Sequence, residues 1–101
     1  SSDLPTIGIR VESLTPARIA EKELGDTRGV LAIRIEVGSI ADDSGLKVND
    51  VIETINRQPI RSAEDFKEVI TSLNPGDPVV LQVYRQRLFP TPRIFISFNK
   101  P

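Results

Sequence analysis

Alternating apolar and polar residues mark several segments of the chain as strands. Residues 7–12 place three apolar side chains at every second position, the period of a strand with one buried face: Ile7, Ile9 and Val11. The same alternation runs through residues 31–37, and shorter apolar runs predict further strands at 50–55, 78–85 and 93–98. The residues 56–60 read as a turn followed by a brief extended piece. Strands therefore dominate the predicted fold.

Helical spacing appears in three places. Residues 16–24 begin after a possible cap at Thr15, with Pro16 at the first helical position and Gly25 at the end. Residues 39–45 form a short helical turn. The clearest helix begins after the cap Ser62 and repeats apolar residues at intervals of three and four: Ala63, Phe66, Val69, Ile70 and Leu73. A few helices are expected beside a small sheet, because they cover its open ends and edges.

The glycine at position 8 stands out within the first alternating segment. An interior glycine weakens a strand because it has no side chain to pack. Taken alone, Gly8 is most simply interpreted as a bulge or a bend. The pattern by itself does not say what the chain gains from it.

Composition narrows the class of protein. The chain has 101 residues, enough for one domain, with 39% hydrophobic and 27% charged residues. The net charge of −1 gives no support for a nucleic-acid partner, and no apolar run approaches the length of a membrane span. The opening Ser1-Ser2-Asp3 is interpreted as the end of a linker, and Arg85, Arg87 and Arg93 as parts of a solvated loop around Pro90 and Pro92.

Absent residue types exclude several chemistries within this chain. There is no cysteine and no histidine, which excludes a Ser-His-Asp triad and any cysteine or histidine metal site. Phosphate-binding glycine loops are absent from the sequence. A Ser-Lys or two-carboxylate enzyme stays formally open, but nothing groups such residues. We therefore expect no catalytic residues, no metal and no cofactor here.

Three stretches in order resemble a PDZ domain, specifically the PDZ domains of the HtrA/DegP family of serine proteases. They are "TIGI", "GSIADDSGLKVNDVIETIN" and "SAEDFKEVI", and a helix directly after the first strand, in "GIRVESLTPARIAEKELG", adds weight. The resemblance implies one mostly β (α+β) domain over residues 1–101, with its core at about 7–98. It further implies five to six strands in a partly open barrel or sandwich, capped by two main helices and cut from a larger protease.

The resemblance also implies a peptide-binding site. Its carboxylate-binding loop would be Thr6, Ile7, Gly8 and Ile9, with Gly8 leaving room for the ligand's terminus. The strand through Arg10 and Val11 would pair with the peptide. The long helix would turn Ala63, Lys67 and Ile70 toward the groove, although Lys67 read alone is simply a solvated lysine. Two residues depart from family patterns: Thr6 replaces a frequent aromatic residue, and Ala63 replaces a histidine of some PDZ domains, which favours an apolar or permissive ligand position.

The implied function is binding of peptide C-termini with an apolar last residue, or of extended segments and unfolded proteins. The protease domain of the same parent serine endopeptidase would be a second partner, in the bacterial periplasm or cell envelope and in protein quality control. Two alternatives stay open. The domain could belong to a C-terminal processing protease or a membrane metalloprotease. It could instead be a packing or assembly domain whose groove is filled by its own chain, for which the tail near Pro101 is the candidate.

Overall fold

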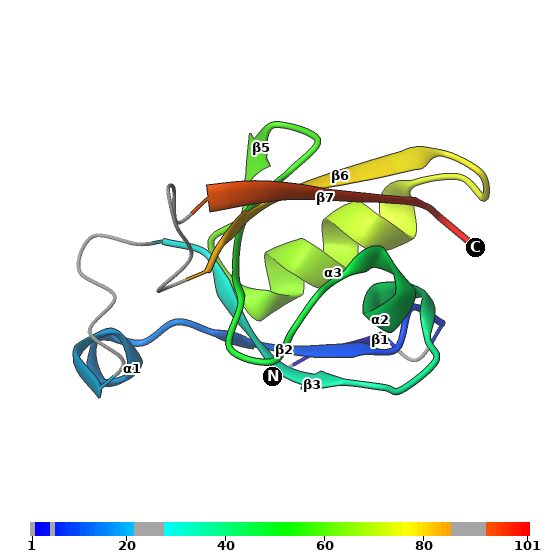
Figure 1. The fold of residues 1–101 in the computed structure, drawn as a ribbon. Helices are drawn as coiled ribbons and strands as arrows, with labels where there is room; N and C mark the ends of the chain where they lie inside the picture. The colour runs from blue at the N-terminus through cyan, green and yellow to red at the C-terminus, as the bar shows by residue number, and fades with distance from the viewer. Residues whose placement is uncertain (1, 5, 22–27, 86–92) are drawn as a thin grey trace.

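One seven-stranded antiparallel sheet forms the body of the domain (Figure 1). The computed structural model describes residues 2–4, 6–21, 28–85 and 93–101. The sheet order is β1-β2-β3-β4-β6-β7, with β5 paired to β4. The strands are β1 (Ser2–Leu4), β2 (Ile9–Ser13), β3 (Val30–Ile35), β4 (Val51–Ile55), β5 (Gln58–Pro59), β6 (Pro78–Tyr84) and β7 (Arg93–Asn99).

Three helices accompany the sheet: α1 (Pro16–Glu21), α2 (Ile40–Ser44) and α3 (Ala63–Ser72). The sheet curves without closing, and its two ends, β1-β2-β3 and β6-β7, lie on opposite sides of α3 (Figure 1). The helix α3 begins where predicted, because the Ser62 hydroxyl accepts a hydrogen bond from the Asp65 backbone N–H at 3.1 Å. It thus occupies the open middle of the curved sheet.

The main core lies between α3 and the inward faces of the strands. Phe66 of α3 is buried among side chains from both ends of the sheet, including Ile9, Val11, Leu81 and Val83. A smaller cluster on the other face joins Leu31 and Val51 to half-buried apolar residues of neighbouring segments: Leu14, Ile19, Ile33 and Tyr84. Because β2 and α3 both belong to the main core, their mutual placement is fixed by packing.

Most predicted elements are confirmed, with three differences. Ile7 and Gly8 lie in a turn, so the first alternating strand begins at Ile9. The structure adds the strand β1, where only a linker end was expected. With β1 and the short β5, the sheet has seven strands instead of the expected five to six. The predicted helix over 16–24 is seen to Glu21; its remainder, the Gly25 cap, Arg87 and the proline turn at 90–92 lie outside the described residues.

A buried ion pair anchors the connection between α2 and β4. The Asp50 carboxylate, 2% exposed, accepts hydrogen bonds from the Lys47 backbone N–H at 2.9 Å and from Arg85 Nη2 at 2.6 Å. Arg85 Nη2 also donates to the Gly45 carbonyl at 2.9 Å. The hydrogen bond with Asp50 raises the pKa of Arg85, against the opposing effect of burial. Arg85 is therefore part of the packed structure, and its interpretation as a solvated loop residue was wrong.

Candidate functional site

The turn that precedes β2 is held against the connection between β3 and α2. The Ile7 carbonyl accepts a hydrogen bond from the Ala41 N–H at 3.0 Å, and the Gly8 carbonyl accepts one from the Glu36 N–H at 2.8 Å. Ser39 caps α2 by accepting from the Asp42 N–H at 3.2 Å, and its hydroxyl donates to the Glu36 carbonyl at 2.7 Å. The predicted carboxylate-binding loop is therefore a fixed turn.

Gly8 meets two requirements that a larger residue does not. Its φ angle of +83° is the left-handed conformation that favours glycine. A Cβ atom built there would lie 2.2 Å from the Ser39 Cβ, far inside van der Waals contact. The resemblance implied that Gly8 leaves room for a ligand's terminus; the described contacts give it a different reason, the close approach of Ser39.

The strand β2 has β3 on one side and β1 on the other. Ile9 and Val11 are buried on the core side, while Arg10 between them is exposed, as the alternation predicts. The pairing with β3 shifts register between Arg10 and Val11, which marks a bulge. At the far end of β2, the Ser13 hydroxyl accepts a hydrogen bond from the Ala63 N–H at 2.8 Å. This bond fixes the start of α3 to the end of β2.

The helix α3 contacts both β2 and β1. Of the residues assigned to the groove, Ala63 and Ile70 are buried and Lys67 is exposed. Phe66 points into the main core as expected, and Val69 and Leu73 are half-buried against it. The structure thus brings the predicted strand and helix close together, with β1 in contact with both. The buried Ile7 and the exposed Thr6 lie in the turn at one end. Whether these residues bind a peptide stays a prediction.

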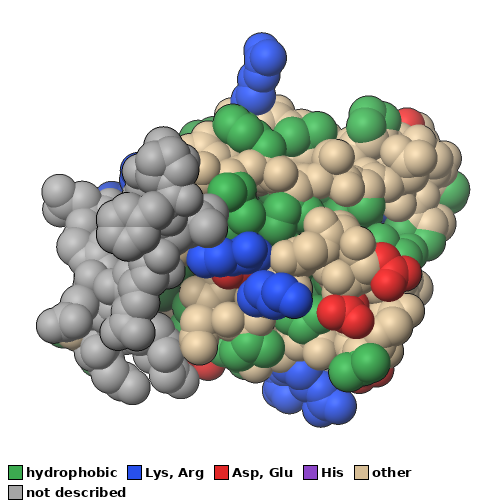
Figure 2. Space-filling view, viewed as in Figure 1, with side chains coloured by type: hydrophobic (Ala, Val, Ile, Leu, Met, Phe, Trp, Pro, Cys, Tyr) green, Lys and Arg blue, Asp and Glu red, His purple; other side chains and the backbone are tan. Residues whose placement is uncertain are grey.

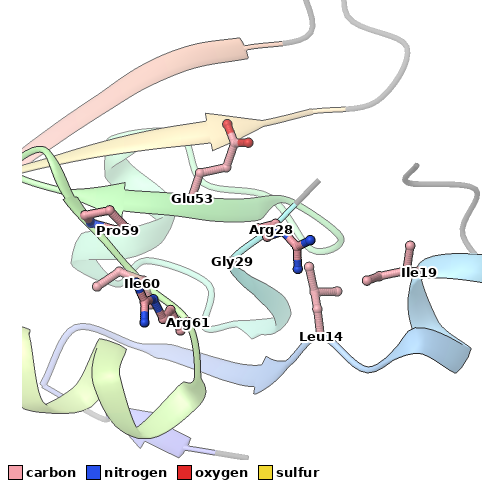
Figure 3. A pocket seen from close by; sticks show the side chains of 8 residues that line it. All are labelled: Leu14, Ile19, Arg28, Gly29, Glu53, Pro59, Ile60 and Arg61. Atoms are coloured by element: carbon pink, nitrogen blue, oxygen red, sulfur yellow. The ribbon is translucent and has the colours of Figure 1, made fainter. Parts of the chain in front are cut away.

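A cavity of about 540 Å³ lies beyond the other end of this groove (Figure 3). Leu14, Ile19 and Ile60 give it apolar walls, and Arg28 and Arg61 add positive charge. Leu14 follows Ser13 at the end of β2, and Arg61 comes just before the cap of α3. The cavity therefore begins past the Ser13–Ala63 hydrogen bond, outside the segment where β2 and α3 lie together.

The charged side chains show no single basic face among the described residues in view. On the face of Figure 2, Lys and Arg side chains stand singly or in small groups, some beside Asp or Glu. Arg93 donates to Glu53 at 3.0 Å and lies over the Tyr84 ring. Within the described residues, no helix has the length and apolar character needed to cross a bilayer.

Sequence reasoning missed three long-range relationships in the fold. The strand β1, the contact between Gly8 and Ser39, and the Asp50–Arg85 pair all join residues that no local pattern connects. Of these residues, only Ser39 had a local signal, because the turn residues around it predicted the cap of α2.

Comparison with known proteins agrees with this architecture. A family model described as "PDZ domain" matches residues 5–88. The chain is 40% identical over 85 residues to a "Probable periplasmic serine endoprotease DegP-like" of Chlamydia pneumoniae, covering 81% of this chain and 17% of that protein. A protein of the same description from Chlamydia trachomatis is 36% identical over 85 residues, with 81% and 16% covered.

Two solved structures share the fold. The HtrA3 PDZ domain bound to a phage-derived ligand (FGRWV) superimposes with a TM-score of 0.75 at 22% identity, covering 92% of this chain and 81% of that one. The HtrA-type protease AlgW with decapeptide gives a TM-score of 0.73 at 24% identity, covering 94% and 29%. Fold, family model and relatives agree, and the chain belongs to the PDZ domain family, in the branch found in HtrA/DegP serine proteases.

Proposed function

We propose that this domain binds the C-terminal ends of peptides by β-strand addition along β2. The peptide would run antiparallel to β2, between β2 and α3, with its terminal carboxylate at the turn formed by residues 6–9. Backbone N–H groups of that turn would donate to the carboxylate, and such charge-assisted hydrogen bonds are short and strong. Extended internal segments of unfolded proteins would use the same edge without the carboxylate contact.

One observation carries the proposal: the edge of β2 opposite β3 already accepts a strand. Residues 2–4 pair with residues 9–11 antiparallel, and α3 lies against that added strand. In strand addition, a peptide forms backbone hydrogen bonds with the free edge of a sheet. The turn before β2 further supports a preformed binding site, because hydrogen bonds from Glu36 and Ala41 to its carbonyls hold it in place.

The residues assigned to the groove support a preference for an apolar last residue. The PDZ resemblance assigns Ile7, Ile9, Val11 and Ile70 to the groove, and all four side chains are aliphatic. Burying an aliphatic ligand side chain among them contributes about 1.5–3 kcal/mol. Lys67 at the exposed rim would add only about 0–1 kcal/mol through a charge contact.

We further propose that the domain serves substrate recognition in a serine endoprotease that carries its catalytic site elsewhere. The chain spans about a sixth of the DegP-like relatives it matches, and these are named periplasmic. Those names favour an HtrA-type parent over a C-terminal processing protease or a membrane metalloprotease. They also favour the periplasm as its compartment and the parent's protease domain as a partner.

A random C-terminal peptide library displayed against the 101-residue domain tests the proposal. We expect enrichment of peptides with an aliphatic last residue and a free terminus. A library with the same sequences followed by a fixed polar extension serves as the control. Equal recovery from both libraries would contradict recognition of C-termini.

A further inference from the structure

The chain's own first strand has the geometry of a bound peptide. β1 pairs with β2 in the register Ser2 opposite Val11, Asp3 opposite Arg10, and Leu4 opposite Ile9. It therefore runs antiparallel to β2, toward the turn at residues 6–8. This is the direction in which a ligand would carry its C-terminus to the carboxylate-binding turn.

The position of β1 is also that of the ligand. It lies on the edge of β2 opposite β3, and it contacts α3. The place between β2 and α3 is therefore filled by backbone from the same chain. Since each edge of a strand pairs with only one neighbour, a peptide and β1 exclude one another.

The segment differs from a true ligand in one chemical respect. Leu4 is joined to Pro5 by a peptide bond, so this occupant has no terminal carboxylate. Its pairing with β2 spans three residues, which is short for a strand. A hairpin-length connection over residues 5–8 holds it close to the edge. The short connection thus keeps β1 at the edge of β2. A peptide with a free carboxylate would form additional hydrogen bonds that β1 cannot form.

From this geometry we infer that residues 2–4 act as an intramolecular competitor, which a peptide must displace from β2. The inference rests on the proposed peptide binding and adds its regulation. It assigns the N-terminal segment to the groove, whereas the sequence had suggested the tail near Pro101. A competitor that fills the groove in nine molecules of ten lowers the apparent affinity for peptide about tenfold.

A truncation measures this competition. The probe is the tightest peptide from the library, labelled with fluorescein, and its affinity is read by fluorescence anisotropy. The variant that begins at Pro5 should bind it about tenfold more tightly than the 101-residue chain. A urea melt of both proteins checks that the shortened domain is folded. Equal affinities of two folded proteins would overturn the inference.

A disulfide lock tests the same competition without removing residues. The chain has no cysteine, so Asp3→Cys with Arg10→Cys provides a single pair at directly opposite positions. Opposite Cα atoms in an antiparallel pair lie roughly 4.5–5.5 Å apart, within the span of a disulfide. Oxidation should lower peptide affinity at least about tenfold relative to the same protein after reduction. The single variant Arg10→Cys, measured as monomer, should show no change with redox state.

The outcomes separate the inference from the function beneath it. If the shortened chain binds the peptide but the oxidised lock binds it equally well, β1 does not compete and only the inference fails. If the shortened, folded chain enriches no peptide from the library, the proposed function fails and the inference falls with it. Tighter binding on truncation together with loss on locking supports both.

Discussion

Gly8 and Ser39 approach so closely that a single added carbon at Gly8 would lie 2.2 Å from the Ser39 Cβ. The contact joins the turn before β2 to the cap of α2. Around it, the Gly8 carbonyl accepts from the Glu36 N–H and the Ile7 carbonyl accepts from the Ala41 N–H. The proposed anion-binding turn is therefore shaped by a second segment of the chain, and that contact can be tested by substitution.

Gly8→Ala should destabilise the domain by about 2–4 kcal/mol, from backbone strain at positive φ and from overpacking against Ser39. The matched control is Gly38→Ala, since Gly38 has a φ of +78° but no atom within 4 Å of the added carbon. Gly38→Ala should lower the free energy of unfolding only through backbone strain, by about 1–2 kcal/mol. Urea melts give both values, and equal losses would show that the Ser39 contact is unimportant.

Asp50→Asn should lower the free energy of unfolding by about 2–3 kcal/mol. The amide cannot accept all the hydrogen bonds that the carboxylate receives from Lys47 and Arg85. Glu36→Gln is the control, because its contact with Arg34 is 3.5 Å long and exposed on both sides. We expect a change of at most about 0.5 kcal/mol there. Similar urea midpoints for both variants would contradict an anchoring role for the buried pair.

Proline substitutions test which side of β2 receives the peptide. Successive residues of a strand point their N–H groups to opposite sides, and the register implied by the PDZ resemblance turns residues 9 and 11 toward the ligand. Val11→Pro should therefore weaken peptide binding more than folding, and Arg10→Pro should do the reverse. Both are best made in the chain that begins at Pro5, where only the peptide pairs with the edge.

Peptide affinity and a urea melt for each proline variant give the readout. If Val11→Pro binds the peptide like its parent and Arg10→Pro folds normally, the peptide-facing and β3-facing sides of β2 are assigned in reverse. Unchanged binding in both would remove β2 as the binding edge.

Local patterns predicted the elements that are stabilised by their own spacing. The alternation of Ile9 and Val11 predicted β2, and the cap at Ser62 with the apolar face around Phe66 predicted α3. The strand boundary at Ile7 was misplaced, because a buried turn residue continues the same alternation.

What escaped prediction depends on partners distant in sequence. The residues of β1 show no strand pattern of their own, and their extended form comes from pairing with the edge of β2. Likewise, nothing near Asp50 indicates Arg85, and nothing near Gly8 indicates Ser39, until the sheet brings them together. The family resemblance assigned the loop and the helix to a peptide-binding groove, whereas the pairing of β1 with β2 beside α3 is seen only in the fold.

The most direct measurement of the central claim compares one peptide in two forms. The tightest library peptide is titrated, with a free C-terminal carboxylate and as its C-terminal amide, against the domain that begins at Pro5. Losing hydrogen bonds to a charged group costs roughly 1.5–3 kcal/mol, so the amide should bind about 10- to 150-fold more weakly. Equal affinity of the acid and the amide would contradict recognition of the terminal carboxylate at residues 6–9.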